Sequence, residues 1–330
     1  MVKAGIVGLG WWGQNLVRSV QGKSASVSFT AGAVRHPEKV AEFADAQNLA
    51  LFDSLDAMLA GADIDAIVLA TPHSIHADQI VAAAAAGKHV FTEKPFTMGK
   101  ADAERAVAAV NAGGVQVAVG YNRRFHPAMI ELRNRIRDGA LGTPLHVEAM
   151  AAIPVGLWLG ADDWRFSRAE WPAGGIAPMG VHQIDHMVDL FGPIKSVYCH
   201  AVRRVVTADI EDTTAVILEF ANGMTGFLST LLAARADNRF AVYGSAGNAE
   251  IRPRSYNRLE FSPLEGAAEI IDYGDYDMDV ETLRAELEAF ADAIKGRAPY
   301  PVLPDQIVHV VAVTDAIIRS AQSRQPVAVA

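Results

Sequence analysis

Short apolar stretches alternate with stretches of helical periodicity through the first 120 residues. Short apolar runs are typical of buried strands, and apolar positions that recur three or four residues apart are typical of helices. This alternation predicts a parallel sheet with helices on both faces. The predicted strands are residues 2–7, 27–34, 64–70, 89–92 and 115–120, and the predicted helices lie near residues 12–21, 37–47, 54–60, 76–86 and 100–111.

The pattern changes after about residue 122. Strand-like stretches now follow one another, and short turns such as Ala221-Asn222-Gly223 and Ala246-Gly247-Asn248 join them, which favours antiparallel hairpins. The predicted strands are residues 145–151, 196–206, 213–221, 224–233, 239–244 and 249–251, and the predicted helices are 127–138, 181–191, 280–295 and 305–323.

These patterns predict an α/β protein of two domains, as the length of 330 residues also favours. The first domain covers residues 1–122. The second, residues 123–330, is an α+β domain with an open, mainly antiparallel sheet, and its C-terminal helix could pack back on the first domain. A partner subunit could cover the open face of that sheet.

Composition narrows the class of protein. The net charge of −9, without a cluster of Lys and Arg, argues against a nucleic-acid partner. The longest apolar run, residues 80–86, is too short to cross a bilayer, and we expect neither a membrane anchor nor a signal peptide. The single cysteine, Cys199, excludes an intramolecular disulfide and suits a reducing compartment. We therefore expect a soluble cytoplasmic protein.

A glycine-rich segment, Gly8-Leu9-Gly10-Trp11-Trp12-Gly13, follows the first predicted strand and opens the first predicted helix. Its spacing suits a tight turn at Gly8, close approach of a pyrophosphate at Gly10, and helix–strand packing at Gly13. An ordinary glycine-rich turn is the alternative. The place of the segment at the start of the strand–helix alternation favours a Rossmann domain that binds a dinucleotide.

The end of the second predicted strand bears on which dinucleotide is bound. An acidic residue there would hold the adenosine 2′-hydroxyl of NAD, but the chain reads Gly32-Ala33-Val34-Arg35-His36-Pro37. Arg35 could meet a 2′-phosphate instead, because a guanidinium forks onto phosphate oxygens. A solvated loop arginine is the alternative. NADP(H) is therefore the favoured cofactor, with NAD(H) as the alternative and Arg35 and His36 as predicted contacts.

Two further polar segments stand at predicted strand ends, where parallel sheets bind ligands. They are Thr71-Pro72-His73, followed by His76, and Glu93-Lys94-Pro95. The predicted contacts of these segments with the dinucleotide are Thr71, Pro72, His73, His76, Glu93 and Lys94. Lys94 lies between an apolar strand and a proline. Partial burial there would lower its pKa and let it donate a proton to a reacting oxygen. The alternative is a surface ion pair between Glu93 and Lys94.

The predicted helix 181–191 carries a polar stripe beside an apolar face. Such a stripe is usually solvated, but the preceding Gly174-Gly175 favours a helix that enters a cleft. His182 suits proton abstraction from an alcohol, and Asp185 could orient a substrate or tune the imidazole. His182, Asp185 and His186 could instead ligate a metal. Because the chain offers no obvious further ligand, we predict no metal.

Together these segments resemble the glucose–fructose oxidoreductase / inositol 2-dehydrogenase (Gfo/Idh/MocA) family. The resemblance implies an NAD(P) domain followed by a sheet domain that makes homodimer or homotetramer contacts. It also implies sugars, polyols or other cyclic alcohols as substrates, with Lys94 and His182 on either side of the reacting carbon. The matching residues are 8–13, Thr71-Pro72 with His76, Glu93-Lys94-Pro95, Gly120-Tyr121-Asn122-Arg123-Arg124-Phe125, Trp164-Arg165, Gly174-Gly175 and Gly180-Val181-His182-Gln183-Ile184-Asp185.

The chain departs from the family at two positions. Many members carry an Asp four residues before the catalytic His, where this chain has Pro178, so proton transfer would use Asp185, a water or the cofactor ribose. His73 replaces a more usual Asn.

Three arginines near the predicted crevice could clamp a carboxylate or hydroxyls of the substrate, or could form structural ion pairs; they are Arg123, Arg124 and Arg165.

The predicted activity is hydride transfer between the nicotinamide and a secondary alcohol or its ketone. The catalytic candidates are Lys94, His182 and Asp185. The alternatives are a glycosidase of the same fold that uses tightly held NAD, and a non-catalytic dinucleotide-binding sensor, which would require neither Lys94 nor His182. The predicted substrate contacts are Tyr121, Arg123, Trp164, Arg165, His182 and Asp185.

Overall fold

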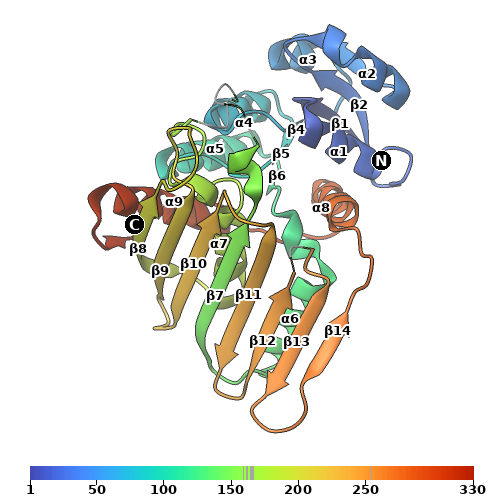
Figure 1. The fold of residues 1–330 in the computed structure, drawn as a ribbon. Helices are drawn as coiled ribbons and strands as arrows, with labels where there is room; N and C mark the ends of the chain where they lie inside the picture. The colour runs from blue at the N-terminus through green and yellow to red at the C-terminus, as the bar shows by residue number, and fades with distance from the viewer. Residues whose placement is uncertain (159, 161–162, 164–166, 254) are drawn as a thin grey trace. The chain divides into compact units, whose positions relative to one another are not determined.

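The computed structural model describes residues 1–158, 160, 163, 167–253 and 255–330, so the predicted contacts Trp164 and Arg165 lie outside the described residues. The chain divides into two compact units (Figure 1). The first comprises Met1–Asn122 and Asp279–Val308, and the second comprises Arg123–Met278 and His309–Ala330. The sequence predicts that the second domain is the continuous range 123–330, whereas the structure groups residues 279–308 with the first unit.

The first unit is built on the predicted parallel sheet. Its strand order is β3-β2-β1-β4-β5-β6, and each neighbouring pair is parallel. The chain order reverses between β1 and β4, and sheets of this kind bind ligands at the carboxyl ends of the strands beside such a point. The strands are β1 (Val2–Val7), β2 (Val27–Ala33), β3 (Ala50–Phe52), β4 (Ala66–Leu69), β5 (His89–Thr92) and β6 (Val117–Val119).

The helices of the first unit follow the predicted periodicity closely. The predicted helix 37–47 is divided into a 3₁₀ turn, Pro37–Lys39, and α2. The edge strand β3 was not predicted, because three residues are too few for a periodic pattern. The helices are α1 (Trp11–Val20), α2 (Ala41–Gln47), α3 (Leu55–Gly61), α4 (His76–Ala85), α5 (Lys100–Gly113) and α8 (Met278–Ile294), of which α8 belongs to this unit from Asp279 onward.

The second unit contains a mixed sheet in the order β14-β13-β12-β11-β7-β10-β9-β8-β15. The two predicted hairpins are confirmed, since β9 pairs with β10 and β11 with β12 in antiparallel fashion. However, β7 and β10 are parallel. The strands are β7 (Pro144–Ala152), β8 (Ile194–Val202), β9 (Thr213–Phe220), β10 (Thr225–Leu231), β11 (Asp237–Gly244), β12 (Gly247–Arg252), β13 (Arg258–Pro263), β14 (Glu269–Asp272) and β15 (Val327–Ala328).

Helices cover one face of this sheet, and the other face is open (Figure 1). Side chains of β9 alternate between buried and accessible positions, so that Ile217 is 58% exposed on the open face. Phe227 of β10, its cross-strand partner, is 37% exposed. The helices are α6 (Pro127–Arg137), α7 (Gly180–Phe191) and α9 (Pro304–Ser323), whose first turn belongs to the other unit.

A buried ion pair joins α7 to the segment before α6. The Arg124 guanidinium donates from Nε to Asp185 Oδ2 (2.7 Å) and from Nη2 to Asp185 Oδ1 (2.6 Å), and both side chains are almost fully buried. Arg124 Nη1 also reaches Asp189 Oδ1 at 2.9 Å, and Asp189 accepts from Arg133. The polar stripe of α7 is therefore neutralised inside the unit rather than solvated.

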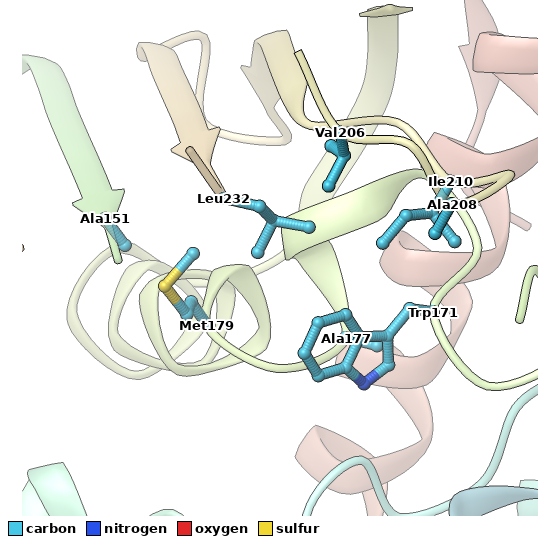
Figure 2. Packing of buried hydrophobic residues seen from close by; sticks show 8 residues of the cluster. All are labelled: Ala151, Trp171, Ala177, Met179, Val206, Ala208, Ile210 and Leu232. Carbon is cyan, nitrogen blue, oxygen red and sulfur yellow. The ribbon is translucent and has the colours of Figure 1, made fainter. Parts of the chain in front are cut away.

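The beginning of α7 is held by apolar packing. Figure 2 shows a cluster in which Trp171 and Met179 meet side chains from the end of β7 and from the segment after β10. The other residues of the cluster come from the segment between β8 and β9. Asp212 Oδ2 stabilises this segment by accepting hydrogen bonds of 2.6–2.9 Å from the backbone N–H groups of three successive residues. The cluster consists of Ala151, Trp171, Ala177, Met179, Val206, Ala208, Ile210 and Leu232.

We predict that Asp185→Asn lowers the free energy of unfolding by about 3 kcal/mol, because it leaves the buried Arg124 guanidinium undercompensated. Urea unfolding followed by circular dichroism would measure the loss. Asp138→Asn, which removes one partner of an exposed ion pair with Arg137, is the matched control and should leave the unfolding midpoint almost unchanged. Equal midpoints for the two variants would contradict a stabilising role for Asp185.

Candidate functional site

The glycine loop between β1 and α1 packs tightly at two positions and is open at a third. Gly8 has φ +93°, and a Cβ there would lie 2.5 Å from the carbonyl oxygen of Ala70. A Cβ on Gly13 would lie 2.0 Å from the carbonyl oxygen of Gly8. A Cβ on Gly10, by contrast, would have no atom within 4 Å. This agrees with the predicted turn at Gly8, the packing at Gly13 and the open approach at Gly10.

The open position lies at the N-terminus of α1. Gly10 is the N-cap residue of this helix, no capping side chain accepts a hydrogen bond from the N–H groups of the first turn, and that turn holds no acidic residue. The first N–H groups of a helix lack partners within it and attract anions. This end of α1 therefore fits the pyrophosphate of a dinucleotide.

The remaining residues of the loop differ in exposure. Leu9 is buried and packs closely on Gly32 of β2, since a Cβ added at Gly32 would lie 2.9 Å from Cδ1 of Leu9. Trp11 is 67% exposed, whereas Trp12 is half-buried and lies beside Glu93. Leu9 thus fixes the loop to the sheet, and Trp12 connects it to the segment that follows β5.

Arg35 and His36 are exposed just beyond the end of β2. Over the described part of the chain, Arg35 has no ion-pair partner. His36 Nδ1 lies 3.3 Å from Oε1 of Glu38, which is the first acidic residue after the strand. The strand end therefore presents a cationic side chain where an NAD-specific site would present a carboxylate.

His76 joins the two polar segments at the ends of β4 and β5. Its ring is fully buried, with Nδ1 2.9 Å from the carbonyl oxygen of Pro95 and Nε2 3.1 Å from that of Thr71. The Thr71 hydroxyl donates to Gln79 of α4 at 2.6 Å. His73 is half-buried in a 3₁₀ turn, with its ring centroid 6.0 Å from that of His76. These contacts favour a positioning role for His76, since it holds the two segments together.

Glu93 and Lys94 differ in how far they are withdrawn from water. Glu93 is 5% exposed, and the Lys94 side chain is half-buried. Burial raises the pKa of Glu93, while the Lys94 charge and the neighbouring Trp12 oppose that rise. The Lys94 backbone N–H also donates to Glu93 Oε2 at 3.3 Å. Lys94 therefore stands beside an acid that has lost its water, and a simple surface pair does not describe the two.

The candidates in the second unit are mostly buried. His182 is 5% exposed near the start of α7, and Asp185 is engaged by Arg124. Arg123 Nη1 donates to the Tyr256 hydroxyl at 3.3 Å. The same hydroxyl accepts from Gln183 Nε2 at 2.8 Å. These contacts favour positioning roles for Arg123 and Asp185 over contact with a substrate.

Three further polar residues are also buried, namely Tyr121, His186 and Glu286. Tyr121 is fully buried at the end of β6 in the first unit. His186 is buried, and its two ring nitrogens have no hydrogen-bond partner within the described residues. Burial holds the pKa of His186 well below its ordinary value, so the ring is neutral. Glu286 of α8, which no motif indicated, is fully buried, and burial holds its pKa well above its ordinary value.

The described residues lack two other kinds of functional feature, a metal-binding cluster and a membrane-spanning helix. Among the residues that the structure describes, no group of three or more His, Cys, Asp or Glu side chains is arranged to hold a metal ion. Within the same residues, no helix combines the length and apolar character needed to cross a membrane.

Known proteins match both units. The pattern described as "Oxidoreductase family, NAD-binding Rossmann fold" matches residues 2–121, and the "GFO/IDH/MocA C-terminal domain" matches residues 129–250. Inositol 2-dehydrogenase of Rhizobium meliloti (strain 1021) is 29% identical over 342 aligned positions, which cover 100% of this chain and 99% of that protein.

Solved structures share the fold. The WlbA dehydrogenase from Bordetella pertussis, in complex with NADH and UDP-GlcNAcA, has a TM-score of 0.88 at 24% identity and covers 100% of this chain and 98% of its own. Levoglucosan dehydrogenase, in complex with NADH and levoglucosan, has a TM-score of 0.89 at 22% identity and covers 99% of both chains. The two matched domains and the full-length relative together show that this chain is a member of the GFO/IDH/MocA family of oxidoreductases, with an NAD-binding Rossmann fold at its N-terminus.

Proposed function

We propose that this oxidoreductase interconverts a secondary alcohol and its ketone on a sugar, polyol or cyclic diol, with a nicotinamide dinucleotide as cosubstrate. The observation that carries the proposal is the half-buried Lys94 next to the buried Glu93, just after β5. Strand β5 pairs with β4, and the residue after β4, Ala70, packs against Gly8 of the glycine loop. The substrate class is supported by relatives named for inositol and levoglucosan.

The cofactor would be held mainly by the backbone. The N–H groups at the start of α1 would receive the pyrophosphate, and the segments that His76 joins would border the rest of the dinucleotide. When bound, the nicotinamide supplies the two-electron redox chemistry. The protein supplies binding, orientation and proton transfer.

Lys94 and His182 both act on the substrate oxygen in this proposal. The Lys94 ammonium donates a hydrogen bond to that oxygen and stabilises the negative charge that develops on it. His182 accepts the proton of the alcohol in the oxidative direction and returns it to the same oxygen in the reductive direction. Because both carboxylate oxygens of Asp185 accept from Arg124, Asp185 is a poor relay, and we infer that His182 exchanges its proton with water.

Lys94→Ala should lower kcat by about 100-fold or more while the protein still binds dinucleotide, because the loss of one donor that stabilises a developing oxyanion costs on that scale. Steady-state assays with free NADPH or NADH and a panel of cyclic polyols and ketones would measure the loss, and tryptophan fluorescence would report binding. Lys100→Ala on α5 is the control.

Two results would contradict this assignment. Unchanged turnover in Lys94→Ala would remove Lys94 from the chemistry. A wild-type protein that cleaves glycosides without net change in free cofactor would favour the glycosidase alternative over the dehydrogenase.

We also propose that the dinucleotide is NADP(H), on the basis of the exposed Arg35 at the end of β2 and the absence of a carboxylate at that strand end. Arg35→Ala should weaken NADPH binding by about tenfold to 100-fold, the usual worth of a hydrogen bond to a charged group, and leave NADH binding unchanged. Fluorescence titration would compare the two. Lys39→Ala is the control nearby, and tighter binding of NADH by the wild-type protein would refute the preference.

The open face of the second unit's sheet is the proposed contact of a homodimer or homotetramer. Ile217 and Phe227 are paired across β9 and β10 on this face. Replacing both by Glu should yield monomers in light scattering, because it places charges in an interface that excludes water. Leu264→Glu, at an exposed position after β13, should leave the assembly intact. A monomeric wild-type protein would overturn the proposed assembly.

A further inference from the structure

Tyr256 is a buried residue of the second unit that no sequence motif indicated. It lies between β12 and β13, its side chain is 1% exposed, and its backbone has φ +59°. A bulky residue rarely adopts this left-handed conformation, which persists only where the surroundings require it. The contacts of the Tyr256 side chain therefore indicate what this conformation serves.

The Tyr256 hydroxyl accepts hydrogen bonds from two segments that are far apart in the chain. Gln183 Nε2 of α7 donates to it at 2.8 Å, and Arg123 Nη1, from the segment before α6, donates at 3.3 Å. The Arg123 guanidinium also lies over the Tyr256 ring, 5.4 Å from its centroid. Two donors use both lone pairs of a hydroxyl oxygen. Tyr256 is therefore the common acceptor that joins α7 to the segment before α6.

The bond to Tyr256 holds α7 through a side chain that has lost its water. Gln183 is fully buried, and its Oε1 has no hydrogen-bond partner among the residues that the structure describes. The bond from Nε2 to Tyr256 is thus the one hydrogen bond that its side-chain amide makes within those residues. A buried polar group that loses such a bond is costly. Without the hydroxyl, the Gln183 amide would be driven to shift toward another partner, and α7 would shift with it.

Helix α7 has a second anchor on its other side, the ion pair between Asp185 and Arg124. Successive residues are rotated by about 100° around a helix axis. Gln183 therefore lies about 100° to one side of His182, and Asp185 lies about 60° to the other side. Because the two anchors flank the direction of His182, together they oppose rotation of α7 about its axis in either sense.

We propose that Tyr256 is a positioning residue: its hydroxyl fixes Gln183 and, together with the ion pair of Asp185, sets the direction in which α7 presents His182. The importance of this direction for the reaction rests on the proposed function, whereas the coupling of Tyr256 to α7 does not. Arg123 holds the hydroxyl from the other side, so that Tyr256 itself is fixed.

Three variants test the proposal. Tyr256→Phe removes the hydroxyl and keeps the ring, and Gln183→Met removes the donor but keeps a side chain of similar length. Tyr273→Phe is the matched control, because its ring belongs to the same aromatic group, 5.8 Å from that of His126, but its hydroxyl makes no hydrogen bond to α7 among the described residues. If Tyr256→Phe does not fold, Gln183→Met tests the same bond from its other end.

Nuclear magnetic resonance of histidine-labelled protein measures the coupling directly. The His182 ring signal is assigned by its loss in His182→Asn. Tyr256→Phe and Gln183→Met should both shift this signal, whereas Tyr273→Phe should leave it in place. The measurement needs no substrate, so it remains decisive if the proposed activity is not found. An unchanged His182 signal in Tyr256→Phe and Gln183→Met would overturn the proposal.

A double-mutant cycle in kcat then tests whether the hydroxyl acts through Gln183. Each single variant should lower kcat by about tenfold with little change in KM, because a small displacement of a catalytic group costs up to about 100-fold. The double variant should also lose about tenfold rather than about 100-fold, because its second change removes a bond that is already absent. Multiplied losses in the double variant, or full activity in Tyr256→Phe, would show that Tyr256 does not position His182 through this bond.

Discussion

Arg124 and Asp185 lose almost all their water when the second unit folds, and two hydrogen bonds between them take its place. The attraction of such a pair offsets its desolvation only when the geometry is close and bidentate, as it is here. Helix α7 is fixed by this pair on one side and by the apolar cluster around Trp171 on the other. The position of His182 on that helix depends on both.

Loss of water also changes the pKa of buried ionisable groups that lack a bidentate arginine partner. Glu93 is buried next to the half-buried Lys94; burial raises the pKa of its carboxyl group, and the Lys94 charge and the neighbouring Trp12 oppose that rise. In the second unit, His186 stays neutral because nearby guanidinium groups add to the cost of burying its charge. The pKa of each buried ionisable group thus depends on burial and on the charges of its neighbours.

The cofactor end of the first unit depends on backbone rather than on side chains. Gly8 and Gly13 let the loop approach β4 and its own helix more closely than any side chain would permit, and Gly10 leaves the helix N-terminus open. This arrangement can receive a pyrophosphate without a buried cation. In the proposed function, discrimination between the two dinucleotides depends on Arg35 at the exposed end of β2.

The sequence by itself determined the type and order of most helices and strands, the glycine loop and the family, because these depend on local periodicity and on contiguous motifs. It did not determine that β7 pairs with β10 in parallel, that residues 279–308 join the first unit, or that Asp185 faces Arg124. Each of these is a contact between residues far apart in the chain, about which periodicity says nothing. Glu286 is the clearest case: a carboxyl on the apolar face of α8 is visible in the sequence, but only the tertiary structure shows that it is fully buried, with no hydrogen-bond partner among the described residues.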